Sequence, residues 1–190
     1  MYNKVDGRLM QAGDRFEFGR YPQGSNGEEK PITWRVLRHD SDSLLVIADM
    51  GLDCKRYHEL ECSITWSNCT LRRWLNDEFY RRAFNGQEQS LVKKTTLANN
   101  AGPMTEDNIF LLSFDDAKNL FSNNNDRICK PTEYAIKNGV STYKGNVYWW
   151  LRSRRHHNSL VAFVLTDGSI RSCNVDYEEG FVRPAFQIAI

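Results

Sequence analysis

Apolar and polar residues alternate along short segments in the first quarter of the chain. The alternation runs through residues 14–23 and again through residues 32–39, which predicts two strands that each bury one face. Residues 43–49 form a near-continuous apolar run, as expected for a central strand covered on both faces. The polar residues 39–42 lie between the last two segments and predict a hairpin turn.

The apolar spacing changes to a helical period after residue 70. Apolar residues recur on one side and charged residues on the other through residues 71–84, which predicts an amphipathic helix. Ser67 or Thr70 is expected to cap its start. Asn85 and Gly86 are expected to end it.

Shorter elements are predicted in the rest of the chain. Ser113, with Asp116 three residues later, has the sequence of a capping box and predicts a helix that starts there. Residues 166–168 (Thr-Asp-Gly) predict a tight hairpin, and Pro184 predicts that the last strand lies at an edge or carries a bulge. The remaining predictions are a short helix within 88–97, helical turns at 132–137, and strands at 109–112, 148–152, 162–165, 169–173 and 182–190.

This order of elements is typical of an α+β domain. Strands at both chain ends, two main helices and a loop-rich C-terminal half predict a domain whose terminal strands pair. Residues 1–190 are expected to form a single domain. The predicted core residues are Phe18, Trp34, Val36, Leu45, Val46, Leu71, Trp74, Leu75, Leu111, Leu120, Trp150 and Leu151.

Composition favours a folded chain without a general attraction to polyanions. Hydrophobic residues make up 41% and aromatic residues 12% of the 190 residues, which is typical of a globule. The net charge of +1 predicts no nucleic-acid and no membrane partner. Residues 1–10 lack an apolar signal core and no apolar run reaches membrane-spanning length. The chain as written is therefore expected to be cytoplasmic, with surface display or export by another route left open.

The cysteines and histidines do not have the spacing of a metal site. Five cysteines occur without a CxxC pair, so neither a zinc site nor a disulfide framework is predicted. His156 and His157 are adjacent, and adjacent residues of a strand face opposite sides. No metal, no cofactor and no catalytic residue is predicted.

Residues 153–177 have an unusual composition between two aromatic flanks. Residues 148–151 (YWWL) precede the segment and residues 181–186 (FVRPAF) follow it. Lys, Glu, Gln, Met and Trp are all absent from 153–177, although these five types supply 34 of the 190 residues. The types present all have codons that end in a pyrimidine, as randomised asparagine codons do. The alternative is a β-rich stretch that lacks those five types for no functional reason.

Several motifs resemble a bacterial family of unknown function whose members look like C-type-lectin-fold domains, related in fold to formylglycine-generating enzymes. The resemblance covers about residues 14–190, and similar domains are the variable proteins of diversity-generating retroelements. Members usually have Pro-Gly after the WWLRS serine, whereas this chain has Arg154 and Arg155, which predicts a different path of the loop there. The motifs are FGRYPQ (18–23), PITWRVL (31–37), LRRWLN (71–76), FLLS (110–113), YWWLRS (148–153) and VRPAF (182–186).

The resemblance implies a C-type-lectin-like fold in which a small second antiparallel sheet displays a ligand-binding face. Trp149, Trp150, Arg152, Arg183 and Pro184 would be scaffold. The implied ligand-binding residues are Arg155, His156, His157, Asn158, Ser159, Leu160, Phe163, Leu165, Arg171, Ser172, Asn174, Asp176 and Tyr177.

Three functions remain open for this face. The first is a recognition surface that binds a ligand, expected to be a protein, through aromatic and arginine anchors. Strand alternation decides one part of it: if Ala162 and Val164 point inward, Phe163 and Leu165 point out. The second is an oxidase of the formylglycine-generating type that uses Cys173, and the third is an assembly domain whose face packs on another subunit. A solvated loop without a ligand is the plain alternative to all three. We expect a non-enzymatic binding protein.

Overall fold

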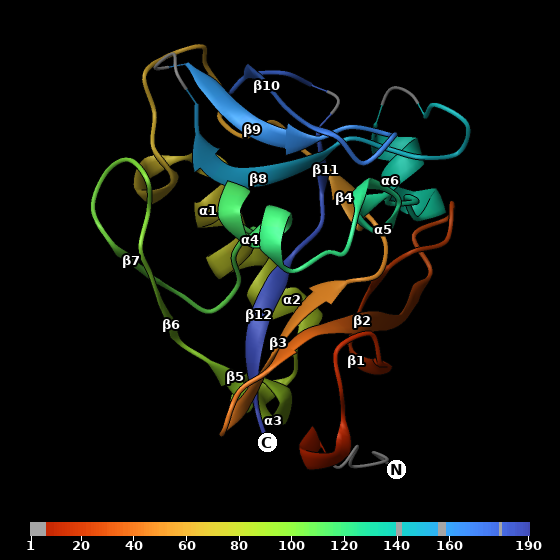
Figure 1. The fold of residues 1–190 in the computed structure, drawn as a ribbon. Helices are drawn as coiled ribbons and strands as arrows, with labels where there is room; N and C mark the ends of the chain where they lie inside the picture. The colour runs from red at the N-terminus through yellow and green to blue at the C-terminus, as the bar shows by residue number, and fades with distance from the viewer. Residues whose placement is uncertain (1–6, 140–141, 156–158, 179) are drawn as a thin grey trace.

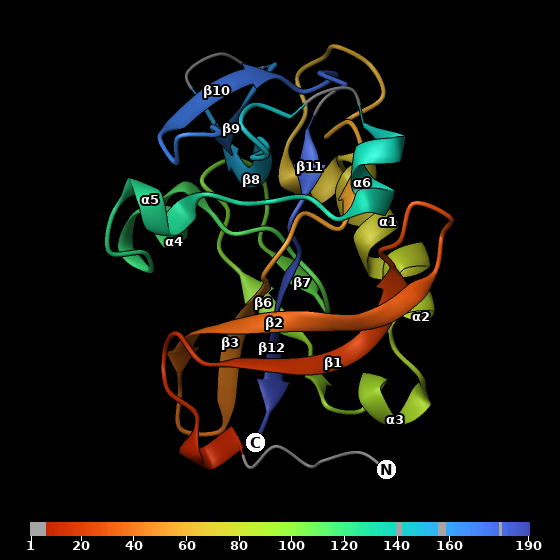
Figure 2. The same cartoon turned by 90° about the vertical axis from the view of Figure 1, so that its right-hand side faces the viewer.

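Two five-stranded sheets organise the described part of the chain, which comprises residues 7–139, 142–155, 159–178 and 180–190 of a computed structural model (Figures 1 and 2). The first sheet has the order β1-β2-β3-β12-β5, the second has the order β10-β9-β8-β11-β4, and β6 pairs with β7. The strands are β1 (Arg15–Pro22), β2 (Glu29–His39), β3 (Ser43–Ala48), β4 (Asp53–Cys54), β5 (Val92–Lys93), β6 (Thr95–Leu97), β7 (Thr105–Asp107), β8 (Trp149–Arg154), β9 (Leu160–Val164), β10 (Ile170–Asn174), β11 (Phe181–Val182) and β12 (Ala185–Ala189).

The helices are few and short. The α-helices are α1 (Thr70–Trp74), α2 (Tyr80–Ala83), α3 (Gly86–Gln89), α4 (Phe114–Asn119), α5 (Asn124–Arg127) and α6 (Glu133–Asn138), with 3₁₀ turns at Gly7–Leu9 and Trp66–Asn68. The mixed helix and strand composition agrees with the α+β prediction. None of the helices in the described ranges has the length and apolar character that a bilayer crossing requires.

The first sheet confirms the predicted hairpin and corrects the predicted pairing of the chain ends. β2 and β3 pair antiparallel, and all six residues of β3 are buried, as the apolar run predicted. β12 pairs with β3 and β5, while β1 pairs with β2. The terminal strands therefore share a sheet but do not pair, because the β2–β3 hairpin occupies the positions between them.

The second sheet is not wholly antiparallel, which corrects another prediction. β8 pairs antiparallel with β9 but parallel with β11. Pro184 does not lie within a strand: it separates β11 of the second sheet from β12 of the first. The missing proline N–H suits a residue that leaves one ladder before the next begins. Figure 1 shows the dark-blue chain passing from the upper sheet into the lower one at this point.

The predicted amphipathic helix is present but irregular. α1 and α2 are joined by a π-helical stretch, Leu75–Phe79. The cap is neither Ser67 nor Thr70, because the Cys69 Sγ accepts the Arg72 N–H at 3.4 Å. The predicted helix at 88–97 is wrong: α3 ends at Gln89, and β5 then pairs with β12.

Capping signals predicted the short helices better than apolar spacing did. Ser113 and Asp116 form the predicted capping box of α4. Thr132 caps the start of α6, and Gly139 is at its end. Residues 109–112 are buried, yet their strand pairing is a single bridge from Phe110 to Ala185.

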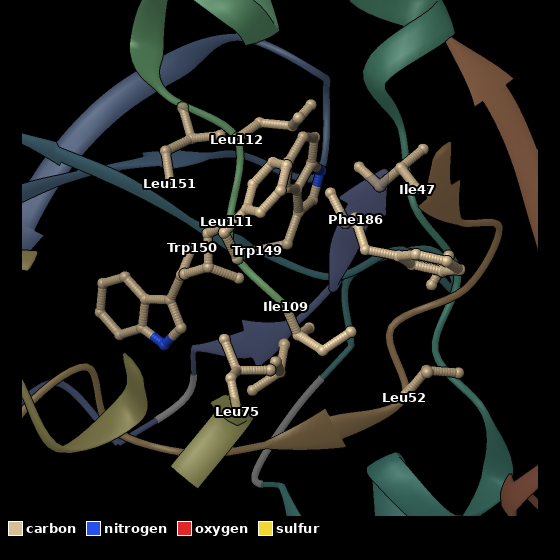
Figure 3. Close-up of a cluster of buried hydrophobic side chains, with 14 of the residues drawn as sticks. Ile47, Leu52, Leu75, Ile109, Leu111, Leu112, Trp149, Trp150, Leu151 and Phe186 are labelled. Carbon is tan, nitrogen blue, oxygen red and sulfur yellow. The ribbon is translucent and has the colours of Figure 1, made fainter. Parts of the chain in front are cut away.

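The buried apolar side chains form one cluster, to which both five-stranded sheets contribute. The predicted core residues are buried except Trp74 and Leu120, which are half-buried and packed against it. Trp149 and Trp150 are both fully buried, and Figure 3 shows their indoles pointing away from each other. The predicted scaffold residues Arg152 and Arg183 are buried with their guanidinium groups donating to backbone carbonyls.

Candidate functional site

The predicted recognition segment folds into the β9–β10 hairpin and the turn after it, at one margin of the second sheet (Figure 2). Residues 166–168 form the predicted turn between the two strands, whose five cross-strand pairs are in regular register. His156, His157 and Asn158 lie outside the described residues.

The register of the hairpin divides the predicted residues between two faces. Phe163 pairs with Arg171, whereas Leu160 pairs with Asn174 and Ser172 lies two residues from Asn174. Directly paired residues share a face, and neighbours along a strand alternate. The structure therefore brings Phe163 and Arg171 to one face, and Leu160, Ser172 and Asn174 to the other.

Phe163 is buried, which corrects the expectation that it points into solvent. Ala162 and Val164 are buried on the opposite face, so the alternation itself is as predicted. However, only 8% of Phe163 is exposed, because the rings of Tyr148 and Trp150 pack against it at centroid distances of 5.8 and 6.3 Å. Alternation gives the face of a side chain but not what covers that face.

The chain after β10 covers this face of the sheet. Val175 is buried, and Gly180 lies so close to Trp150 that an added Cβ would approach the indole to 1.9 Å. Only glycine fits at position 180 without moving the indole. Tyr177 remains 37% exposed and its ring meets Tyr148 at 6.4 Å.

The exposed members of the predicted set cluster on β10 and the turn after it. Arg171, Ser172, Asn174 and Tyr177 are exposed, while Ser159, Leu160, Leu165 and Asp176 are half-buried. Arg155 is also half-buried, and its guanidinium lies 4.4 Å from the centroid of the Phe114 ring. Arg155 therefore has a packing role at the junction with α4 as well as a charged head.

The tip of the hairpin is fixed to the scaffold. Arg127 Nε donates to the Gly168 carbonyl at 2.8 Å, and Asn146 Nδ2 donates to the Thr166 carbonyl at 3.2 Å. Gly168 has a φ of +77°, and an added Cβ would lie 1.7 Å from the Asn124 carbonyl oxygen. The turn consequently has one backbone path that glycine alone allows.

The other end of the hairpin is fixed as well. The Val175 N–H donates to the Ser159 carbonyl at 3.0 Å, and the His58 N–H donates to the Val175 carbonyl at 2.8 Å. At the end of β8, the Asn100 side-chain amide donates to the Arg154 carbonyl and accepts the Arg154 N–H. β10 is thus held at both ends, while the side chains of Arg171, Ser172 and Asn174 are exposed.

Cys173 lies within β10 but does not have the environment of an activated thiol. It is half-buried, and burial, with a smaller contribution from the Asp176 carboxylate, raises its pKa to about 12. A thiol with this pKa stays protonated near neutral pH, whereas nucleophilic cysteines are thiolates. Among the residues that the structure describes, no group of three His, Cys, Asp or Glu side chains is arranged for a metal ion.

A polar groove of about 510 Å³ lies beside the turn after β10. Lys55 Nζ is 4.6 Å from the centroid of the Trp74 ring, and Arg56 forms an ion pair with Glu178, which also lines the groove. Both signs of charge line it, so it favours no simple ion. The lining residues are Cys54, Lys55, Arg56, Glu59, Thr70, Leu71, Arg73, Trp74, Asp77, Glu78 and Glu178.

The sequence interpretation did not include the residues that fix the hairpin. Arg127 and Asn146 are far from β10 along the chain, and no local pattern connects them to it. Tyr148 was placed in the aromatic flank, yet its ring lies between Phe163 and Tyr177. Its alternation with the buried Trp149 is the signal that places it on the Phe163 face.

A comparison with protein families finds one described as "Domain of unknown function (DUF6273)", which matches residues 41–190. The match includes β3, both strands of the hairpin and β12, but not β1 or β2. No curated protein and no solved structure matches the chain.

Proposed function

For this chain, which belongs to the DUF6273 family, we propose a non-enzymatic function: it binds a macromolecular ligand, a protein, through the β10 surface. We define the β10 surface as the exposed side chains of Arg171, Ser172, Asn174 and Tyr177. Within this proposal the fold is C-type-lectin-like, and the chain is a variable protein of a diversity-generating retroelement.

The observation that carries the proposal is the separation of backbone order from side-chain burial along β10. All its residues pair with β9 in regular register, and none of them is buried. Arg127, Asn146 and His58 hold the hairpin and its exit through backbone carbonyls and amides. Side chains on such a strand can change without loss of the fold, and a preorganised surface loses little entropy on binding.

The composition of residues 153–177 supports the diversification part of the proposal. The five absent residue types are those that randomisation of asparagine codons at adenines does not reach. The exposed part of this segment has the character of a paratope, with Tyr177 as an aromatic anchor and Ser172 and Asn174 as adaptable polar groups. Arg171 adds a guanidinium that suits carboxylates of a protein partner.

The binding experiment compares two triple variants of the full chain. The immobilised wild-type chain captures its partner from an extract of the source cells. R171A/S172A/N174A is expected to bind that partner at least tenfold more weakly, because it removes three of the four side chains of the β10 surface and keeps the scaffold. The matched control, K94A/T96A/E106A, changes three exposed residues, of which Thr96 and Glu106 pair across β6 and β7 and Lys94 precedes β6, and it is expected to retain the partner. Equal capture by both variants contradicts the binding proposal.

The diversification part has its own test in the DNA around the gene. We expect a reverse transcriptase gene and a second, template copy of the region that encodes residues 153–177. The template should differ from the gene at adenines. A gene without these neighbours removes the retroelement from the proposal and leaves the binding surface to the capture experiment.

A further inference from the structure

β10 is an edge strand whose outer side has no partner in the described part of the chain. It is the first strand in the order β10-β9-β8-β11-β4. An edge strand presents backbone N–H and C=O groups to any extended segment that reaches it. Figure 2 shows β10 at the margin of the second sheet, where no other strand lies outside it.

The hydrogen bonds at the two ends of the hairpin show which backbone groups point outward. Leu165 bonds to Ser169 and Val175 bonds to Ser159, so every second pair between these ends is a hydrogen-bonded pair. The residues of β10 that bond to β9 are therefore Arg171 and Cys173. Ile170, Ser172 and Asn174 direct their N–H and C=O groups away from β9.

Two of the three outward carbonyls already accept a hydrogen bond from within the chain. The Asn174 carbonyl accepts the Tyr177 N–H, and the Ile170 carbonyl accepts the Arg171 guanidinium. Within the described ranges, the N–H and C=O of Ser172 have no partner. An incoming strand would form a two-bond pair at Ser172, with further bonds from the amides on either side of it.

β10 lacks the features that protect the other long edge of the molecule. β1 is also an edge strand, but a bulge interrupts its pairing with β2, and it carries Arg15, Glu17, Arg20 and Pro22. Bulges, prolines and charges are the usual means of blocking edge pairing. β10 has five residues in regular register, no proline and one charged residue, Arg171.

The side chains on this edge indicate the chemistry of the occupant. Arg171 is exposed and forms no ion pair with a carboxylate among the described residues, so a strand beside it would be favoured by an acidic side chain opposite. Cys173 lies on the same face and is half-buried, so an apolar side chain suits the position opposite it. In an antiparallel partner the apolar residue would precede the acidic one by two positions.

We propose that β10 binds an extended peptide segment of a partner protein as an added antiparallel strand, with an apolar residue opposite Cys173 and an acidic residue opposite Arg171. This rests on the proposed function and names its partner class and binding mode. A second copy of the chain fits less well, because two five-residue strands offer far less than the ~1,200 Å² of a stable interface.

The test selects peptides that bind the full chain and then removes one backbone N–H from β10. A phage-displayed library of random seven-residue peptides is expected to yield sequences with the apolar-x-acidic pattern. A selected synthetic peptide should bind S172P at least tenfold more weakly than it binds S172A, because both variants lack the hydroxyl group but only S172A keeps the N–H. Proline at position 172 removes an N–H that makes no bond to β9, so the fold should persist. Exchange of the Ser172 and Asn174 amides with deuterium should slow on binding.

The outcomes separate this inference from the proposed function. If S172P does not fold, a peptide methylated on the backbone nitrogen opposite Ser172 replaces it, and equal binding of that peptide overturns strand addition. Strand addition is also overturned if the library yields no peptide that binds the wild-type chain better than it binds S172P. Self-association of the chain through the same edge would overturn it as well. If S172P still captures the cellular partner and R171A/S172A/N174A does not, the recognition surface stands and strand addition fails. If neither variant affects capture, both proposals fail.

Discussion

β8 and β10 flank the same strand, β9, and are used in opposite ways. Five of the six residues of β8 are buried, whereas none of the five residues of β10 is. Both strands nevertheless pair with β9, β10 in regular register and β8 with an irregularity between Trp150 and Arg154. The difference shows that backbone order and side-chain burial are separate properties, and that only the second makes a side chain necessary for folding.

Each strand obtains its order from a different source. β8 is fixed by packing, because Trp149 meets Phe121 on one side of the sheet and Trp150 meets Tyr57 on the other. β10 is fixed by contacts to backbone groups around it, such as the bond from Arg127 to the Gly168 carbonyl. Substitutions should therefore be costly in β8, costly at the clamp of the hairpin, and nearly free in β10.

The largest effect is expected for W150A in β8. Trp150 is fully buried, its Nε1 donates to the Lys55 carbonyl at 2.7 Å, and Gly180 packs directly on its indole. Removing a buried tryptophan should lower the free energy of unfolding by about 3–5 kcal/mol. Denaturant titration measures this. Y143A, which truncates a 60% exposed aromatic residue, should change it by less than about 0.5 kcal/mol. Similar costs for the two variants would contradict the assignment of β8 as scaffold.

A smaller loss is expected for G168A at the tip of the hairpin. The new Cβ would meet the Asn124 carbonyl at 1.7 Å, and φ at this residue is +77°. Backbone strain and overlap together should cost about 2–3 kcal/mol in thermal or denaturant unfolding. The matched control is G27A, because Gly27 has a φ of +80° with nothing within 4 Å of its Cβ position. If G168A costs no more than G27A, the clamp does not fix the turn.

The ion pair between Arg152 on β8 and Asp116 on α4 predicts that the stability of the fold depends on pH. Burial alone would raise the pKa of Asp116, but the Arg152 guanidinium and the Ser113 hydrogen bonds outweigh it and hold the pKa below its ordinary value of 3.8. The lower pKa in the folded state means that this stabilisation is complete above the unfolded pKa and is lost as pH falls through the folded one. D116N should cost about 1–2 kcal/mol at neutral pH and should lose less stability than the wild type below about pH 4.

Unfolding curves at several pH values measure this difference. D115N is the control, since Asp115 is the exposed neighbour of Asp116 on α4. It should have the pH dependence of the wild type. The same acid sensitivity in D116N would show that the pair does not tie β8 to α4.

Local signals in the sequence predicted the elements that depend only on neighbouring residues, such as a helix cap, a tight turn and a buried strand. The capping box at Ser113, the turn at residues 166–168 and the buried run of β3 were confirmed. Predictions that depended on remote partners were wrong. Residues 92–97 have helical spacing, yet pairing with β12 and β7 makes them strands. Tertiary pairing overrides weak helix propensity in such short segments.

The candidate site was predicted in the same uneven way. Alternation gave the correct face for Phe163, but the Tyr148 ring and the chain after β10 cover that face. Arg171 and Ser172, which the sequence placed in one binding set, lie on opposite faces of β10, and both are exposed because the strand is at the edge of its sheet. The edge position of β10 depends on the order of the strands, which no local pattern records.

The smallest effect is expected for R171A/S172A/N174A in β10. These side chains are exposed, and the ladder to β9 uses backbone groups that alanine keeps. The free energy of unfolding should change by about 0.5 kcal/mol in total, mostly through the lower strand propensity of alanine. L151A in β8 serves as the single-site comparison, because Leu151 is fully buried and its loss should cost about 2–5 kcal/mol. If the triple variant loses more free energy of unfolding than L151A does, the side chains of β10 stabilise the fold. Such a strand cannot then provide a surface whose side chains change freely while the backbone stays in place.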